Sequence, residues 1–320
     1  MDQLLMLKQR QCGENKWKIT ISNVKYDKGN IAKWQVKYKL VEDEHWNTTE
    51  DCEFFVYKSG TYIIKLVNND VESEKKQIKL VIEEENYISK TEPYVGYYAD
   101  IEGDGIVDGV IYADLAIGKT KTGQLAGTEE KYDIPIEKDV KDYTISQKNY
   151  EGKFGTKDVI KPVEGNIGKD RFYVMALEDK VGDPKYTWYN SAKGKMQDYI
   201  TTTAIDFGKG KSNTNIMIDK WNLNAYGEKN KDPNYKDVWG AITTEVKKGW
   251  FVPSKNESIA FAGELEITKE NYASKKLEGC YWTSSQYGAE HAWTAYFNIG
   301  KMGGFFVDST LVFLRLSRIF

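Results

Sequence analysis

An acidic, glycine-containing stretch at residues 100–108 is the pattern best suited to a chemical role. Its oxygen side chains fall at positions one, three, five and nine, and position seven offers a main-chain carbonyl. In order along the chain, these residues are Asp100, Glu102, Asp104, Ile106 and Asp108. Hard cations bind oxygen ligands spaced in this way at ~2.4 Å. The spacing therefore predicts a calcium site whose role is to make the loop rigid.

The stretch resembles the D-x-[DN]-x-D-G-x-x-D calcium loops of dockerins and integrin-type repeats. It departs from them at Glu102, which is longer than the usual Asp or Asn. Position twelve is Ile111, where a full EF-hand has a bidentate glutamate. The alternative interpretation is an acidic turn between two strands.

Two further patterns fall short of a catalytic site. Residues 207–212 (FGKGKS) look like a phosphate loop, but the Walker spacing requires a glycine where Ile205 stands. We expect a glycine-rich loop before a helix there. His291 follows Glu290 and could form an acid/base pair, but no activated nucleophile lies at a motif spacing from it.

Cysteine and histidine are too few for most metal or thiol chemistry. Cys12, Cys52 and Cys280 are widely spaced, so they form neither a disulfide framework nor a metal knuckle. A Cys12–Cys52 bridge is the alternative to reduced core thiols. With His45 and His291 as the only histidines, zinc sites and histidine-dependent triads have almost no ligands to use.

Composition excludes two classes of partner. The formal net charge is −3 and the pI is about 5.7, without a basic stripe, so we expect no nucleic acid partner. No segment approaches the ~20 apolar residues of a membrane helix, so we expect no membrane insertion. Residues 1–11 do not form a signal peptide. Either the protein is not exported by that route or this sequence lacks its leader.

The elements that must position these residues fall into two parts. Between residues 16 and 83, apolar side chains alternate in short runs, which predicts antiparallel strands with one buried face. The phrase SGTYIIKLVNND resembles the late hairpin of bacterial immunoglobulin-like (Ig-like) modules. We therefore predict an all-β Ig-like sandwich over residues 1–86 and a polar linker over 87–93.

The patterns in residues 94–320 predict a domain that contains both strands and helices. Strand patterns dominate up to residue 185, with the firmest runs at 110–115, 159–162 and 171–177. Helix patterns follow at 212–221, capped by Ser212 or Asn213, and at 237–248. A third helix, at 254–266, opens with the spacing of a capping box. Strand patterns return after it.

The strongest resemblance lies in the last quarter of the chain. The runs GWFVPSKNE, YWTSSQYGAEHAW, AYFNIGKMGGFF and LRLSRIF look like the signature of bacterial and phage domains related to the C-terminal part of collagen-like adhesins. Those domains share the C-type lectin fold with the variable proteins of diversity-generating retroelements. GDGIVDGVIYADLA and DRFYVMAL resemble the upstream part of gut-bacterial and gut-phage members. The resemblance implies an α+β C-type-lectin-like domain with a β-rich insertion over residues 94–320, with a variable binding segment at 280–320.

The resemblance also divides this segment into framework and contact positions. The framework positions are Tyr281, Trp282, Ser284, Ser285, Ala292, Trp293, Phe297, Gly300, Arg315 and Leu316. The positions where related proteins vary their ligand contacts are Tyr287, Gly288, Glu290, His291, Thr294, Tyr296, Asn298, Lys301, Phe305, Phe306, Asp308, Thr310 and Phe313. Alternation along residues 291–298 agrees with one packed and one free face. The alternative for Phe305, Phe306 and Phe313 is a place in the core.

The predicted function is non-catalytic ligand or receptor binding. The enzyme branch of this fold resembles a copper-dependent oxidase that needs a cysteine pair near its active site, and only Cys280 lies within residues 94–320. The E-P-N, Q-P-D and W-N-D triplets of calcium-dependent sugar binding do not occur. The expected partner is a protein or glycan receptor on a cell surface, bound from a phage tail tip or a bacterial surface. Assembly as a homotrimer, or as a component of a virion, is also expected from the same resemblance. The alternatives are a glycan hydrolase using Glu290 and Asp308, and a structural spacer.

Overall fold

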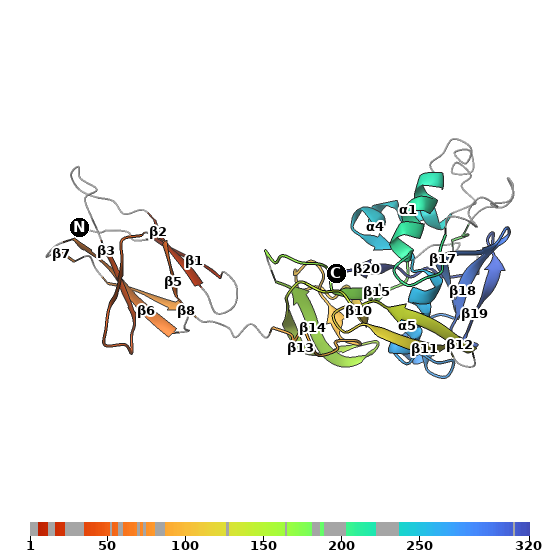
Figure 1. The fold of residues 1–320 in the computed structure, drawn as a ribbon, viewed down its shortest axis with the longest axis horizontal. Coiled ribbons are helices and arrows are strands. Elements are labelled where there is room, and N and C mark those ends of the chain that lie inside the picture. The colour runs from red at the N-terminus through yellow and green to blue at the C-terminus, as the bar shows by residue number, and fades with distance from the viewer. Residues whose placement is uncertain are drawn as a thin grey trace. The chain divides into compact units, whose positions relative to one another are not determined.

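The protein is mostly β-sheet with few helices, and its chain divides into two compact units, Met1–Asn86 and Tyr87–Phe320 (Figure 1). The structure is a computed structural model. It describes residues 6–11, 17–22, 35–51, 53–56, 60–68, 71–72, 75–80, 87–125, 128–163, 165–180, 186–188, 203–221, 237–309 and 311–320. None of the helices in these ranges is both long enough and apolar enough to span a membrane.

The first unit contains two antiparallel sheets around one core. One sheet has the order β1-β2-β5, with the bounds Met6–Gln11, Trp17–Ser22 and Glu53–Val56. The other has the order β4-β3-β6-β7, and β8 also pairs with β6. Its strands are β3 (Gln35–Leu40), β4 (Asn47–Thr49), β6 (Gly60–Asn68), β7 (Val71–Glu72) and β8 (Lys76–Leu80).

Alternating side chains from both sheets of the first unit form its core, as their period of two predicts. The buried members are Ile19, Val36, Leu40, Phe54, Val56, Tyr62, Ile64 and Leu66. The two sheets of the first unit therefore share one hydrophobic core. Cys12 and Cys52, and with them the predicted bridge, lie outside the described residues.

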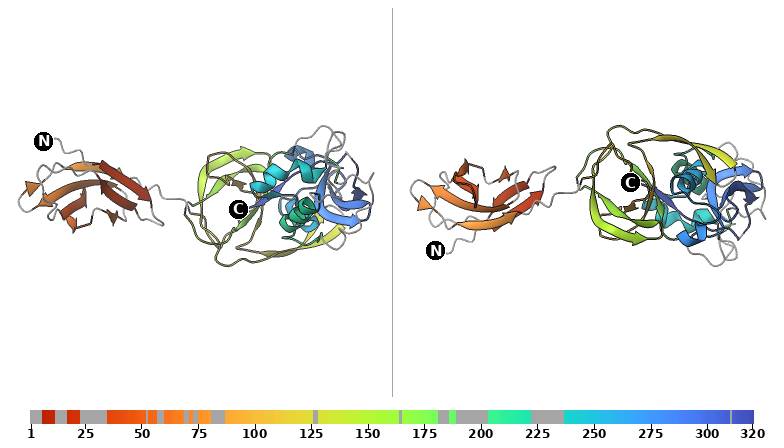
Figure 2. Two further views of the ribbon diagram at one scale, coloured as in Figure 1. Left: turned by 90° about the horizontal axis from the view of Figure 1, so that it is seen from above. Right: turned by 90° about the horizontal axis from the view of Figure 1, so that it is seen from below.

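A seven-stranded sheet with the order β13-β14-β9-β10-β15-β20-β16 organises the second unit (Figures 1 and 2). Its strands are β9 (Tyr98–Ala99), β10 (Gly109–Asp114), β13 (Tyr143–Gly152), β14 (Gly155–Pro162), β15 (Phe172–Ala176), β16 (Trp250–Phe251) and β20 (Ser317–Ile319). Only the β14–β9 pair is parallel within this order. β10, β14 and β15 confirm the three firmest strand predictions.

Two smaller sheets and several short helices complete the second unit. The hairpin pairs β11 (Lys119–Leu125) with β12 (Thr128–Ile134), and the other sheet has the order β17-β18-β19. The bounds of these three strands are Cys280–Gly288, His291–Tyr296 and Lys301–Phe306. The helices are α1 (Gly210–Trp221), α3 (Val238–Ala241), α4 (Thr243–Lys247), α5 (Lys255–Glu264) and a 3-10 helix at Tyr272–Lys275.

Two of the three helix predictions need correction. The predicted helix at 237–248 is two short helices, because Ile242 leaves helical geometry with φ −107° and ψ 6°. Gly240, a weak helix former, lies two residues before this break. The predicted caps of α1 are also wrong, since that helix begins at Gly210 and Asn213 lies buried within it. The predicted capping box of α5 is confirmed, with Ser254 and Glu257 bonded to each other's backbone N–H groups.

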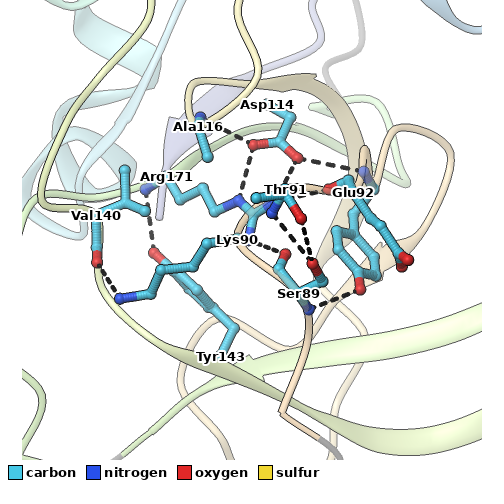
Figure 3. Close-up of polar contacts among 10 residues, drawn as sticks. Ser89, Lys90, Thr91, Glu92, Asp114, Ala116, Val140, Tyr143 and Arg171 are labelled. Atoms are coloured by element: carbon cyan, nitrogen blue, oxygen red, sulfur yellow. Dashed lines mark hydrogen bonds and ion pairs between the residues drawn. The ribbon is translucent and has the colours of Figure 1, made fainter.

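The segment 87–93 is not a linker, because it packs into the second unit. Ile88 is buried with residues of β10, β14 and β15. Figure 3 shows Arg171, which is fully buried, donating hydrogen bonds to the carbonyl oxygens of Ser89 and Glu92, each at 2.9 Å. Its guanidinium also forms two 2.8 Å bonds to the buried carboxylate of Asp114. One buried arginine therefore fixes this segment to the sheet, which its polar composition did not indicate.

Candidate functional site

The predicted binding segment forms the antiparallel sheet β17-β18-β19 at one end of the second unit (Figure 1). Side chains of directly opposite residues lie on the same face of such a sheet. Gly288 pairs with His291, and His291 pairs with Phe306. Trp293 pairs with Gly304 in the next row of this face. The register therefore gathers aromatic side chains of β18 and β19 at the end of the sheet, and Tyr287 joins them from the irregular end of β17 through its contact with Trp293.

We call the side chains of Tyr287, His291, Trp293 and Phe306 the aromatic face. Tyr287 and Phe306 are each 57% exposed. The rings of His291 and Phe306 have centroids 4.4 Å apart. The Tyr287 ring packs edge-on against Trp293 at 4.6 Å. These contacts restrict the rings while leaving large apolar surfaces open to solvent, which is an arrangement that favours recognition.

Gly304 provides the space that the Tyr287 ring occupies. A Cβ atom at position 304 would lie 2.4 Å from Cδ1 of Tyr287, well inside van der Waals contact. On the inner side, Lys255 from the first turn of α5 places Nζ 4.2 Å from the centroid of the Trp293 ring. This distance suits a cation–π interaction. Gly304 and Lys255 thus position the aromatic face without being aromatic themselves.

The framework beneath this face is a buried network of hydrogen bonds. Trp282 is fully buried and donates through Nε1 to the carbonyl of Tyr186 at 2.9 Å. Ser285 Oγ donates to the carbonyl of Ala204 at 2.8 Å and accepts from the N–H of Lys255 at 3.1 Å. Buried polar groups that are satisfied in this way hold one geometry. β17 is therefore fixed to α5 and to the segment before α1.

Comparisons with known proteins add no name to this site. No family model, no curated protein and no solved structure matches the chain. The aromatic face is therefore interpreted from its own geometry.

Most of the predicted contact residues reach the surface. Those at least partly exposed are Tyr287, Gly288, Glu290, His291, Tyr296, Asn298, Lys301, Phe305, Phe306, Asp308 and Phe313. Thr294 is fully buried, so its prediction as a ligand contact is wrong. Its neighbours explain the burial, because Thr294 pairs with Trp282 on one side and Gly303 on the other. Thr310 lies outside the described residues.

The opposite face of the sheet carries a smaller aromatic group. Gly303 faces the ring of Tyr296, whose Cε2 would lie 3.1 Å from a Cβ at position 303. Tyr296 packs edge-on against Phe305 at 6.1 Å, and Phe305 packs against the core residue Trp282. Burial raises the pKa of Tyr296 to about 12, so its hydroxyl stays protonated at neutral pH. Phe305 is thus partly a core residue, as its alternative interpretation held.

The remaining framework predictions differ in their burial. Tyr281 and Arg315 are buried and both bond to Asp179, Tyr281 at 3.0 Å through its hydroxyl and Arg315 at 2.6 Å through Nε. Phe313 is half-buried, with its ring centroid 6.0 Å from that of Tyr281. Trp293 was predicted as framework, but it is only partly buried and belongs to the aromatic face.

The acidic loop at residues 100–108 is closed by its own backbone amides. Asp100 is almost fully buried, and its two oxygens accept from the N–H groups of Asp104 and Gly105, each at 3.0 Å. Asp108 accepts from the N–H of Ile101 at 2.8 Å. Burial, followed by the charges of Asp100 and Asp104, raises the pKa of Asp108 against the effect of that hydrogen bond.

The predicted calcium ligands do not converge on one point. Glu102 forms a 2.6 Å ion pair with Arg318 instead. Within the described ranges, no group of three or more His, Cys, Asp or Glu side chains could hold a metal ion. The calcium site stays a prediction, and calorimetry with calcium and with EDTA tests it. Bound calcium should give heat on titration and a higher melting temperature, and the absence of both would contradict it.

The glycine-rich loop before α1 has a structural role that its sequence did not reveal. Glu257 of α5 is fully buried and accepts from the N–H groups of Gly208 and Gly210, at 3.1 and 3.3 Å. A Cβ at position 210 would lie 2.1 Å from Oε2 of Glu257. The loop therefore holds a carboxylate of the protein itself. Burial raises the pKa of Glu257 to about 7, although its hydrogen bonds act in the opposite direction.

Proposed function

We propose that the protein is a non-catalytic ligand-binding protein whose contact surface is the aromatic face. The observation that carries this proposal is the pair Tyr287 and Phe306, each 57% exposed at the end of a sheet whose interior is buried. A few exposed aromatic side chains on a rigid support supply most of the affinity in many protein interfaces. The polar residues around them, such as Glu290 and Asp308, would set selectivity.

The arrangement also supports variation of the contact residues. Trp282 and Ser285 of β17 are buried, while most of the predicted contact side chains are at least partly exposed. Exchanging an outward side chain leaves the core face in register. We therefore propose that the second unit is a C-type-lectin-like domain of the kind found in variable proteins of diversity-generating retroelements, and that the first is an Ig-like module carrying it.

The proposed partner is a protein or glycan receptor on a cell surface. The proposed location is a phage tail tip or a bacterial surface, and assembly as a homotrimer or a virion component belongs to the same proposal. All of these rest on the resemblance of residues 249–320 to adhesin and variable domains, together with the exposed aromatic face.

Binding of the full chain to a panel of bacterial cells tests this function. The labelled protein is compared with a Tyr287→Ala/Phe306→Ala double variant. An Ile167→Ala variant is the matched control, because that side chain is 94% exposed and lies outside the β17–β19 sheet. We expect the double variant to lose binding while keeping its melting temperature, and the control to bind normally. Full retention of binding by the double variant would refute the aromatic face as the contact surface.

The same material distinguishes the two alternatives. A hydrolase would release sugar from a glycan panel and lose that turnover in an Asp308→Asn variant. A structural spacer would bind no cell, and its β17–β19 sheet would tolerate substitution without effect. Cell binding that depends on Tyr287 and Phe306, without turnover, is the result that the proposed function requires.

A further inference from the structure

A second candidate site lies away from the aromatic face, between the start of the second unit and α5. It is a cleft of about 480 Å³, a size typical of small-molecule sites. Its described walls come from residues 93–95, the β10–β11 connection, β12 and the last residue of α5. The lining residues are Pro93, Val95, Asp114, Ile117, Gly118, Lys119, Ile134 and Glu264. The walls are thus mainly aliphatic, with charge at two places.

The first charged place, Asp114, has no capacity left for a ligand. Its two oxygens accept the Nε and NH2 bonds of Arg171 (Figure 3). They also accept the N–H groups of Tyr94, at 3.2 Å, and Ala116, at 3.0 Å. The bond to Tyr94 fixes residues 93–95 as one wall of the cleft. Asp114 and Arg171 neutralise each other, so this part of the cleft has a structural role.

The second charged place is different, because its counter-ion is exchangeable. The Glu264 side chain is only 5% exposed, and its Oε2 accepts from Nζ of Lys119 at 2.9 Å. The hydroxyl of Tyr132 donates to the other oxygen. Lys119 itself is 46% exposed, so its ammonium group can move into water without disturbing the core.

The position of Glu264 favours a cation on physical grounds. A nearly buried carboxylate needs a positive partner, since leaving it alone in a dry site is costly. Glu264 also ends α5, where the partial negative charge of the helix dipole adds to its own. Burial raises the pKa of Tyr132, so its hydroxyl remains a donor to one oxygen. The other oxygen is left for one ammonium group at a time.

We propose that this cleft binds an aliphatic ammonium group, either a free alkylamine or a lysine side chain, with Glu264 as its counter-ion and Lys119 as a built-in competitor. The alkyl chain would lie against Val95, Ile117 and Ile134 while the ammonium takes the place of the Lys119 group. A neutral or anionic ligand would gain the same apolar contacts, but it could not replace the Lys119 ammonium group as the partner of Glu264. The site is independent of the aromatic face.

Titration calorimetry and NMR on the full chain test this site with n-pentylamine as the probe. Pentanol and pentanoate are the matched neutral and anionic controls. A six-atom ligand should bind with a dissociation constant on the order of 1 mM. The Glu264→Gln variant should weaken binding by about tenfold or more, since it removes a charge-assisted hydrogen bond. The Lys119→Met variant should instead strengthen binding by about threefold to tenfold, because it removes the competitor.

Opposite behaviour of the two variants is the decisive feature. If Lys119→Met weakens the binding of pentylamine, Lys119 does not compete with the ligand for Glu264, and the proposal is overturned. It is also overturned if pentanol binds as well as pentylamine. A third contrary result is that neither wild type nor Lys119→Met binds pentylamine at about 10 mM, ten times the expected dissociation constant. Should Glu264→Gln fail to fold, Lys119→Met still decides the question, because the Lys119 side chain is 46% exposed and its replacement should leave the core intact. Binding of Nα-acetyl-lysine methylamide at least as tight as that of pentylamine identifies a lysine side chain as the source, and weaker binding identifies a free amine.

Discussion

Replacing Arg171 by methionine should lower the free energy of unfolding of the second unit far more than any substitution on the nearby surface. The substitution keeps much of the aliphatic stem but removes the guanidinium, whose four hydrogen bonds reach Asp114, Ser89 and Glu92. Asp114 would stay buried with two backbone N–H groups and no positive charge. Breaking a buried ion pair on one side costs about 3–5 kcal/mol. We expect the free energy of unfolding of the second unit to fall by about that amount.

Hydrogen exchange measured by mass spectrometry is the suitable assay, because it reports on each unit separately. Peptides from β10 and β15 should lose protection, and peptides covering residues 87–93 should lose it most, since two of their carbonyls lose their donor. Peptides from β3 and β6 in the first unit should not change. Lys169→Met is the matched control, because Lys169 forms an exposed ion pair with Glu137, and it should have no measurable effect.

A double variant tests whether the loss of stability comes from the unpaired charge of Asp114. Asp114→Asn removes the charge that Arg171→Met leaves unpaired, so the combined variant should be more stable than the sum of the two single effects predicts. If Arg171→Met changes the exchange of β10 and β15 by less than about 1 kcal/mol, the buried pair does not hold the segment in place and the argument fails. Equal loss of protection in both units would also contradict it.

Three further substitutions test the aromatic face and the helix α5 that supports it. Gly304→Ala should move the Tyr287 ring by about 1 Å and abolish cell binding, whereas the Ile167→Ala control should bind normally. The folded pKa of Glu257 lies near 7, above its usual 4.5, so the advantage of wild type over Glu257→Gln in unfolding free energy should decrease as pH rises from about 4.5 to 7, by roughly 3 kcal/mol. A constant difference would contradict this. Ser254→Ala should cost about 1–2 kcal/mol in thermal unfolding by removing the cap of α5.

Local patterns predicted the elements whose causes are local. The alternation around Val36 and Ile64 gave the strands of the first unit, and the Ser254–Glu257 spacing gave the start of α5. The division of residues 280–320 into framework and contact positions came instead from the family resemblance, and alternation agreed with it only along residues 291–298. Thr294 shows the limit of this reasoning, because alternation separates two faces but does not tell whether the second face is covered too.

Features that join distant parts of the chain could not be predicted in this way. The polar composition of residues 87–93 indicates a linker, yet the carbonyl groups of Ser89 and Glu92 meet Arg171 from a strand far along the chain. The partly exposed position of Trp293 depends on Gly304 and Lys255, which come from another strand and from a helix. No local pattern records such partners.

The position of β20 limits which sequence changes in the aromatic face are compatible with folding of the second unit. Residues 317–319 pair with β15 on one side and β16 on the other, so a strand translated after the aromatic face lies inside the seven-stranded sheet. A frameshift or stop codon anywhere in residues 287–306 would remove this strand together with Arg315. Such a chain would leave β15 paired only with β10 and would leave the edge strand β16 without its partner, so we expect it to misfold. If the proposed function holds, this position of β20 predicts that truncated copies of the face misfold and that only in-frame exchanges of side chains yield a folded binding face.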